Sequence, residues 1–205
     1  MLKGLGVLAS GRGTNLEAIM AAIERGDLAA RVAVVVSDAP DAAALGRARS
    51  RGVPAVAVNP SGHPTRREFE TTLVRTLREN GADVVILAGF MRLLGKTFLE
   101  AYQGQTLNIH PSLLPTFPGL EAQRQALDAG VKVSGCTVHY VDHGMDTGPI
   151  IAQRSVPVRE DDTVETLSAR ILAQEHDLYW RAIALHLQGR LVIVGRRVKV
   201  LSEAE

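Results

Sequence analysis

The segment Leu5-Gly6-Val7-Leu8-Ala9-Ser10-Gly11-Arg12-Gly13-Thr14-Asn15 joins a short apolar run to a helical segment through a glycine-rich turn. Residues 14–25 carry apolar side chains at helical spacing, and Gly26 follows them as a helix stop signal. The segment therefore predicts a strand, a tight turn and a helix, which is the opening unit of an α/β fold.

The same alternation continues to about residue 110. Val32–Val36 is a β-branched run, as expected of a strand buried on both faces of a parallel sheet. The other elements predicted in this part are strands at Ala55–Val58, Val84–Ala88 and Thr106–Ile109, and helices at Ala42–Arg51, Thr65–Asn80 and Gly95–Tyr102. We expect a Rossmann-like fold, in which a doubly wound, mostly parallel open α/β sheet places its ligand crevice outside the carboxyl ends of the strands.

The pattern changes after Pro111. Proline-rich Ser112–Leu120 predicts an ordered loop. The remaining predicted elements are a short helix at Glu121–Ala129, strands at Val133–Val141 and Pro149–Val158, a long helix at Thr163–Leu187 and a small hairpin at Leu191–Val200. Because no linker or repeat interrupts the sequence, we expect one domain over residues 1–205, with halves at 1–110 and 111–205.

The amino-acid composition argues against several classes of partner and location. The chain has 23 Lys and Arg against 22 Asp and Glu, a formal net charge of +1, which argues against a nucleic-acid partner. Its one cysteine, Cys136, allows no intramolecular disulfide, is expected to be a buried small hydrophobe, and favours a cytoplasmic location. We expect no membrane partner and no leader segment, since no apolar stretch approaches the roughly 18–20 residues of a spanning helix.

The glycine-rich turn is the first candidate site. Glycines allow the backbone to approach a ligand, and a helix N-terminus offers unpaired N–H groups to an anion. The turn has neither a third glycine at position 16 nor a Gly-Lys-Ser/Thr sequence, so it suggests one phosphate group rather than a dinucleotide or triphosphate. The alternatives are an ordinary turn capped by Thr14 or Asn15, and, because Asp38 follows the second strand, a dinucleotide site.

Asn108 and His110 form the second candidate. Residues two apart on a strand point to the same side, and here they do so where a parallel strand ends. An amide beside an imidazole can stabilise an oxygen that gains negative charge during acyl transfer. The alternative is a polar strand end that satisfies loop backbone groups.

The connection at 139–149 is the third candidate. We expect Asp146, bracketed by glycines, to lie near His110 and to raise the pKa of that imidazole. The alternatives are a solvent-exposed loop and a metal site built from His139 and His143 with Asp142 or Asp146. In a strand, positions 139 and 143 would lie about 13 Å apart at roughly 3.3 Å per residue, which is too far to share an ion.

Four motifs together resemble the folate-dependent formyltransferase family: Ser-Gly-x-Gly-Thr-Asn at 10–15, Leu-Ala-Gly-Phe-Met-Arg at 87–92, Asn-Ile-His-Pro-Ser-Leu-Leu-Pro at 108–115, and Asp-x-Gly-Pro at 146–149. The resemblance is in register over almost the whole chain. It implies transfer of a formyl group from 10-formyltetrahydrofolate to the amine of glycinamide ribonucleotide, in de novo purine biosynthesis. The alternatives are hydrolysis of 10-formyltetrahydrofolate, a dinucleotide-dependent dehydrogenase and a non-catalytic nucleotide-binding module.

The resemblance also implies roles for single residues. Asn108, His110 and Asp146 match the catalytic residues. Those implied in ribonucleotide binding, mainly within half 1–110, are Gly13, Thr14, Asn15 and Glu175. Those implied in folate binding, including the loop in half 111–205, are Arg66, Met91, Arg92, Leu93, Leu94, Asn108, Asp142, His143, Gly144, Met145 and Asp146.

Arg67, next to Arg66, is the alternative folate-contacting arginine. The implied co-substrate is 10-formyltetrahydrofolate, with no metal. The implied partners are small-molecule substrates only, and the chain is expected to be a monomer or a homodimer.

Overall fold

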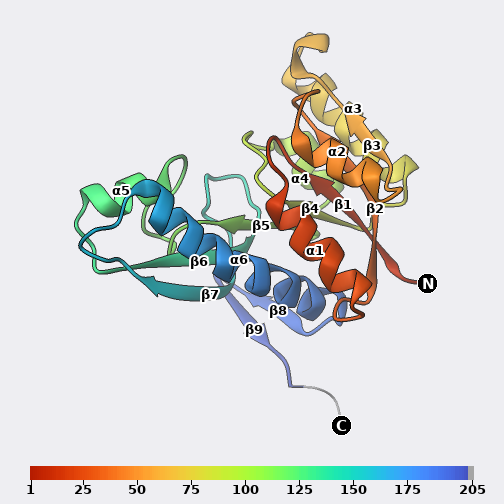
Figure 1. Cartoon of the computed structure of the whole chain (residues 1–205). Coiled ribbons are helices and arrows are strands. Elements are labelled where there is room, and N and C mark those ends of the chain that lie inside the picture. The colour runs from red at the N-terminus through yellow and green to blue at the C-terminus, as the bar shows by residue number, and fades with distance from the viewer. Residues whose placement is uncertain (203–205) are drawn as a thin grey trace. The chain divides into compact units, whose positions relative to one another are not determined.

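A computed structural model describes residues 1–202 of the chain (Figure 1). Its backbone contacts divide the chain into two compact units, and the boundary follows Asn108. This boundary lies two residues before the one expected between the halves, whereas the single-domain organisation remains a prediction.

The first unit is built on parallel strands. Its elements in chain order are β1 (Lys3–Leu8), α1 (Thr14–Glu24), β2 (Ala30–Ser37), α2 (Ala43–Ser50), β3 (Ala55–Ala57), the 3₁₀ turn η1 (Pro60–Gly62), α3 (Arg66–Glu79), β4 (Val84–Leu87), α4 (Lys96–Ala101) and β5 (Thr106–His110).

Strand order in this unit is β3-β2-β1-β4-β5, and each neighbouring pair is parallel. Val34, Val35 and Val36 of β2 are completely buried, as the β-branched run predicted. The chain adds β2 and β3 on one side of β1 and then β4 and β5 on the other. The strand order therefore reverses between β1 and β4, and ligands bind at the carboxyl ends of the strands at such a point.

The second unit combines a mixed sheet with one long helix. Its elements are α5 (Ala122–Asp128), β6 (Val133–Tyr140), β7 (Ile150–Pro157), α6 (Val164–Leu187), β8 (Leu191–Val194) and β9 (Arg197–Val200). β6 pairs with β7 antiparallel, β9 pairs with β7 parallel, and β8 and β9 form the terminal hairpin. Helix α6 packs on β6 and β7 (Figure 1). It begins with a capping box in which Thr163 and Thr166 each accept a backbone N–H of the other.

These elements confirm the predicted fold class, with its long C-terminal helix and terminal hairpin. Most element ends lie within one or two residues of the sequence-based bounds, while η1 was not predicted. The Leu114–Pro115 peptide bond is cis. None of the helices within residues 1–202 is both long enough and apolar enough to cross a membrane.

Gly4 lets two backbones approach closely in the first unit. A Cβ atom at this position of β1 would lie 2.0 Å from the carbonyl oxygen of Gly81, which is backbone and cannot rotate away. Asp83 closes the same contact, since its N–H donates to the Gly4 carbonyl and its carboxylate accepts the Gly4 N–H. The junction between α3 and β4 is therefore fitted to a residue without a side chain.

We predict that Gly4→Ala lowers the free energy of unfolding by about 1–3 kcal/mol or more, because the new methyl group forces the backbones apart. Gly46→Ala is the matched control, since its Cβ in α2 would meet nothing within 4 Å. Replacing a helical glycine by alanine should raise stability by about 0.5–1 kcal/mol. Urea unfolding of both variants measures this, and equal effects would contradict the close contact.

Candidate active site

Two loops meet at the strand-order reversal of the first unit. One follows β1 and contains the glycine-rich turn, and the other follows β4. The Ser10 N–H donates to the Gly89 carbonyl at 2.9 Å, and the Ser10 hydroxyl accepts the Met91 N–H at 2.9 Å. These two hydrogen bonds join residues from two of the sequence motifs at the place where this sheet topology binds ligands.

The glycine-rich turn presents the start of α1. Gly13 has a φ of 74°, and a Cβ atom there would lie 2.8 Å from the Cβ of Ala44, so both conformation and space require glycine. No side chain among the described residues caps α1 through a hydrogen bond. The start of this helix has the geometry that suits an anion. Phosphate binding here remains a prediction.

The segment after β4 carries the residues that the resemblance implies in folate binding. Met91 and Leu93 are large apolar side chains that are 64% and 56% exposed, whereas Leu94 is buried. Arg92 is half-exposed and donates through Nε to Asp38 at 2.7 Å. The segment therefore exposes apolar surface at Met91 and Leu93, while Arg92 between them is hydrogen-bonded within the protein.

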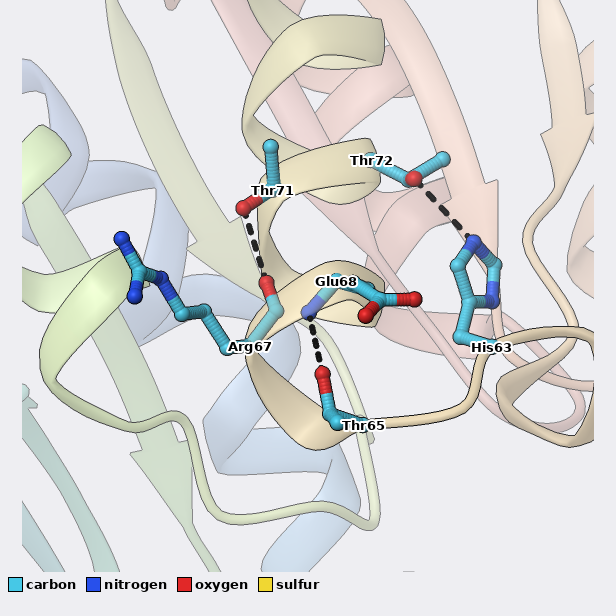
Figure 2. Close-up of a pocket in the computed structure, with 6 residues that line it drawn as sticks. All are labelled: His63, Thr65, Arg67, Glu68, Thr71 and Thr72. Atoms are coloured by element: carbon cyan, nitrogen blue, oxygen red, sulfur yellow. Dashed lines mark hydrogen bonds between the residues drawn. The ribbon is translucent and has the colours of Figure 1, made fainter.

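The two candidate arginines at the start of α3 differ sharply. Arg66 donates to Glu70 at 2.8 Å and to the Leu93 carbonyl at 2.7 Å. The guanidinium of Arg67 has no hydrogen-bond or ion-pair partner within residues 1–202. Figure 2 shows Arg67 pointing away from His63, which bonds Thr72 on the other side of an open surface pocket. Arg66 therefore has a role within the protein, and a folate contact by either arginine is a prediction.

In the second unit, Asp146 lies between two buried imidazoles. Its Oδ2 is 3.4 Å from Nδ1 of His110, and its Oδ1 is 3.7 Å from Nε2 of His139. The other nitrogen of each ring faces a carbonyl oxygen, that of Phe117 at 2.8 Å for His110 and that of Tyr140 at 2.9 Å for His139. Because a carbonyl only accepts, those two nitrogens carry protons. Each ring is thus oriented with its remaining nitrogen toward the carboxylate.

The backbone of Asp146 is itself unusual, with a φ of 54° in the left-handed region. Such a conformation is uncommon outside glycine and marks a constrained position. The Gly119 N–H donates to Asp146 Oδ2 at 2.8 Å and fixes the carboxylate. Upstream, Asp142 Oδ1 accepts from the Gly144 N–H at 3.1 Å and the Thr147 hydroxyl at 2.6 Å, which folds the loop on itself.

Burial and hydrogen bonding shift the pKa values of both Asp146 and His110. Burial raises the pKa of Asp146, but hydrogen bonds from His139 and the Gly119 N–H outweigh it and the net pKa is lowered. For His110, burial lowers the pKa and outweighs the Phe117 hydrogen bond and the Asp146 charge, which both raise it; the nearby His139 lowers it further. The expectation that the pKa of His110 would be raised is therefore wrong, because desolvation exceeds the attraction of Asp146.

The remaining predicted residues fall in several environments. Asn108 lies two residues before His110 on β5 and is half-buried. Glu175 is buried on α6, whereas His143, Gly144 and Met145 are exposed in the loop. Buried Cys136 is no nucleophile, since burial first and Glu175 second raise its pKa to about 12.

Sequence reasoning missed three contacts of this cluster. His139 was considered only as a metal ligand, although its position on a strand end near Asp146 could have indicated a second imidazole partner. The Phe117 carbonyl and the Gly119 N–H are backbone groups, and no side-chain pattern reveals them. Within residues 1–202, no group of three or more His, Cys, Asp or Glu side chains has the arrangement of a metal site.

Comparison with known proteins places the chain among formyl-transferring enzymes. Residues 4–183 match the sequence profile of the family described as formyl transferase. The chain is 47% identical over 178 residues to phosphoribosylglycinamide formyltransferase of Bacillus subtilis, which covers 87% of this chain and 91% of that protein. Glycinamide ribonucleotide transformylase 1 from Symbiobacterium toebii is 55% identical, with a TM-score of 0.97 over 98% of this chain and 95% of that one.

Two further relatives are longer than this chain, which covers only part of each. A formyltetrahydrofolate deformylase from Pseudomonas syringae is 27% identical with a TM-score of 0.90, and 67% of its chain is covered. The trifunctional purine biosynthetic protein adenosine-3 of Drosophila melanogaster is 42% identical over 193 residues, and this chain spans 14% of its length.

We predict that the pKa of His110 lies below the ordinary value of 6.5, with burial as the main cause. Asp146→Asn should lower it further, because the variant removes a charge that favours the imidazolium. His139→Gln should raise it, because the variant removes a neighbouring group that disfavours the imidazolium. Titration of ¹⁵N-labelled histidine by NMR measures all three proteins, and shifts in the same direction for both variants would contradict the assignment.

Proposed function

The chain belongs to the formyl transferase family, and from this premise we propose that it transfers the formyl group of 10-formyltetrahydrofolate to the amine of glycinamide ribonucleotide. Relatives named for this activity match most of the chain at high identity. The observation within the chain that carries the proposal is the carboxylate of Asp146, held between His110 and His139 at 3.4 and 3.7 Å.

In the proposed reaction, the ribonucleotide amine attacks the formyl carbon and a tetrahedral intermediate forms. Asn108 donates to the oxyanion that develops, and His110 stabilises the same charge. The attacking nitrogen must lose one proton and N10 of the folate must gain one. We assign this transfer to the pair of Asp146 and His110, acting through water.

The lowered pKa of His110 suits this sequence of events. At neutral pH the imidazole of the free protein is mainly uncharged, because burial disfavours its cation. A negative charge developing on the formyl oxygen favours the imidazolium, so His110 takes up, through water, the proton that the attacking nitrogen loses and later passes it to N10 of the folate. The charge is thus present when the transition state needs it.

The binding residues are proposed by position. Gly13, Thr14 and Asn15 at the start of α1 bind the substrate phosphate, and buried Glu175 binds the ribose. The exposed apolar side chains after β4 and the loop around Asp146 bind the folate. The full list proposed for the folate is Arg66, Met91, Arg92, Leu93, Leu94, Asn108, Asp142, His143, Gly144, Met145 and Asp146.

The proposed chemistry is acyl transfer between two bound small molecules and invokes neither a metal nor a covalent enzyme intermediate. Holding both reactants in place can supply roughly 7–11 kcal/mol of the barrier. We also propose a cytoplasmic location, in keeping with the single, reduced Cys136.

The assay that tests the activity follows loss of the formyl group from 10-formyltetrahydrofolate optically, with and without glycinamide ribonucleotide. We expect formyl loss only when the ribonucleotide is present. Release of formate at the same rate without it would instead identify a deformylase, the activity for which the Pseudomonas syringae relative is named. Absence of both reactions contradicts the proposal.

We predict that Asp146→Asn reduces kcat by roughly 10²–10⁴-fold, the usual contribution of general acid–base catalysis. The Kd for glycinamide ribonucleotide should change little, because the phosphate site is proposed at α1. Asp128→Asn, an exposed position at the end of α5, is the matched control and should retain full activity. Steady-state kinetics and calorimetric binding measure the two quantities, and an unchanged kcat in Asp146→Asn excludes the assigned role.

A further inference from the structure

The segment Gly89–Gly95 poses a structural problem within the first unit. It contains no helix or strand, yet it presents Met91 and Leu93, which are 64% and 56% exposed. Because this segment lacks regular backbone hydrogen bonds, other contacts must fix its backbone so that its apolar side chains stay out of the core. Two buried carboxylates, one directly after β2 and one on α3, supply these contacts.

Asp38 is the first of these carboxylates. It directly follows β2, and its side chain is only 9% exposed. Its Oδ2 accepts a hydrogen bond from Nε of Arg92 at 2.7 Å, while its Oδ1 is buried without a hydrogen-bond partner in the described part of the chain. A carboxylate this buried depends on its one cation for stability, so the pair holds Arg92 firmly to the end of β2.

Glu70 on α3 is the second carboxylate, with a side chain 4% exposed. Its Oε1 accepts from the Gly95 N–H at 2.6 Å and from Nε of Arg66 at 2.8 Å, and its Oε2 accepts from the Phe98 N–H at 3.4 Å. Arg66 in turn donates to the Leu93 carbonyl at 2.7 Å. Glu70 therefore fixes the far end of the segment and the start of α4.

Between the two carboxylates, the Ser10 hydroxyl holds the Met91 N–H. Together these hydrogen bonds and ion pairs fix the backbone of segment Gly89–Gly95 at both ends and near its middle. The side chains of Met91 and Leu93 remain exposed to solvent. We propose that Asp38 and Glu70 are positioning residues, which act through Arg92 and Arg66 to preorganise Met91 and Leu93 as an apolar platform for the folate ring.

This inference rests on the proposed function, since it takes the folate as the platform's ligand. It also changes the role of two arginines. Arg66 and Arg92, which the resemblance implies as folate contacts, act here mainly by holding the segment, because Nε of each guanidinium donates to one of the protein's own carboxylates. Preorganisation of this kind lowers the ordering penalty of binding and so appears in affinity for the folate.

Asp38→Ala tests the platform most directly. We expect it to raise KM and Kd for 10-formyltetrahydrofolate roughly 5- to 50-fold, within the range that a 1 Å misplacement causes. The kcat at saturating folate and the KM for glycinamide ribonucleotide should stay within about twofold, since neither depends on the platform. Asp38→Asn retains an acceptor for Arg92 and should fall between wild type and Asp38→Ala.

Asp27→Ala is the matched control, because Asp27 makes the same type of contact, Oδ2 with Nε of Arg25 at 2.8 Å, on the exposed surface. It should leave all kinetic constants unchanged. Hydrogen exchange gives a readout independent of activity: the Met91 amide should exchange faster in Asp38→Ala and the Gly95 amide faster in Glu70→Gln, with neither changed in Asp27→Ala.

A double-mutant cycle separates holding from direct binding by Arg92. If Arg92 acts through Asp38, then Arg92→Gln should add almost nothing to the loss in an Asp38→Ala background. Additive losses would show that the guanidinium itself binds the folate and would overturn the assignment. Unchanged folate KM and amide exchange in Asp38→Ala and Glu70→Gln, in a wild type that formylates the ribonucleotide, would also overturn it. A wild type without that activity fails the proposed function instead, and the exchange data still report on the platform.

Discussion

A carboxylate that leaves water keeps its charge only where donors replace the lost hydration. Asp146 accepts the Gly119 N–H and faces one ring nitrogen of His110 and one of His139. Because Gly119 lies on a loop, His110 is the last residue of β5 and His139 lies on β6, the carboxylate contacts three separate segments of the second unit. It also explains why Asp146 tolerates a φ of 54°, since the surrounding contacts determine its conformation.

The same principle organises the first unit. Asp38 and Glu70 are also buried carboxylates, and each accepts from an arginine that is itself substantially exposed. In each case a charge that is unfavourable to bury is paired with an arginine that holds an irregular segment, and that segment exposes Met91 and Leu93, the proposed folate contacts. Regular secondary structure satisfies its own backbone groups, whereas the segment after β4 depends on carboxylates that directly follow β2, in the case of Asp38, or lie on α3, in the case of Glu70.

The sequence predicted the fold well because the signals for it are local. The run Val32–Val36 indicated β2 without reference to any other part of the chain, and the two-residue spacing of Asn108 and His110 placed them on one side of β5. The pairing of Asp38 with Arg92 joins residues 54 positions apart, and only the strand order brings the ends of β2 and β4 near each other. The sequence named both residues but contained no signal that they meet.

The direction of the His110 pKa shift likewise depends on the folded structure and could not be predicted from the sequence. The sequence correctly indicated the attraction of Asp146, which is a matter of which residue types are present. Desolvation depends on how completely the fold encloses the ring, and it outweighs that attraction. A cationic His110 in the free protein would stabilise ground state and transition state alike. In the proposed reaction, an imidazole kept neutral by burial would instead stabilise charge only when an oxyanion forms, and such differential stabilisation is what accelerates a chemical step.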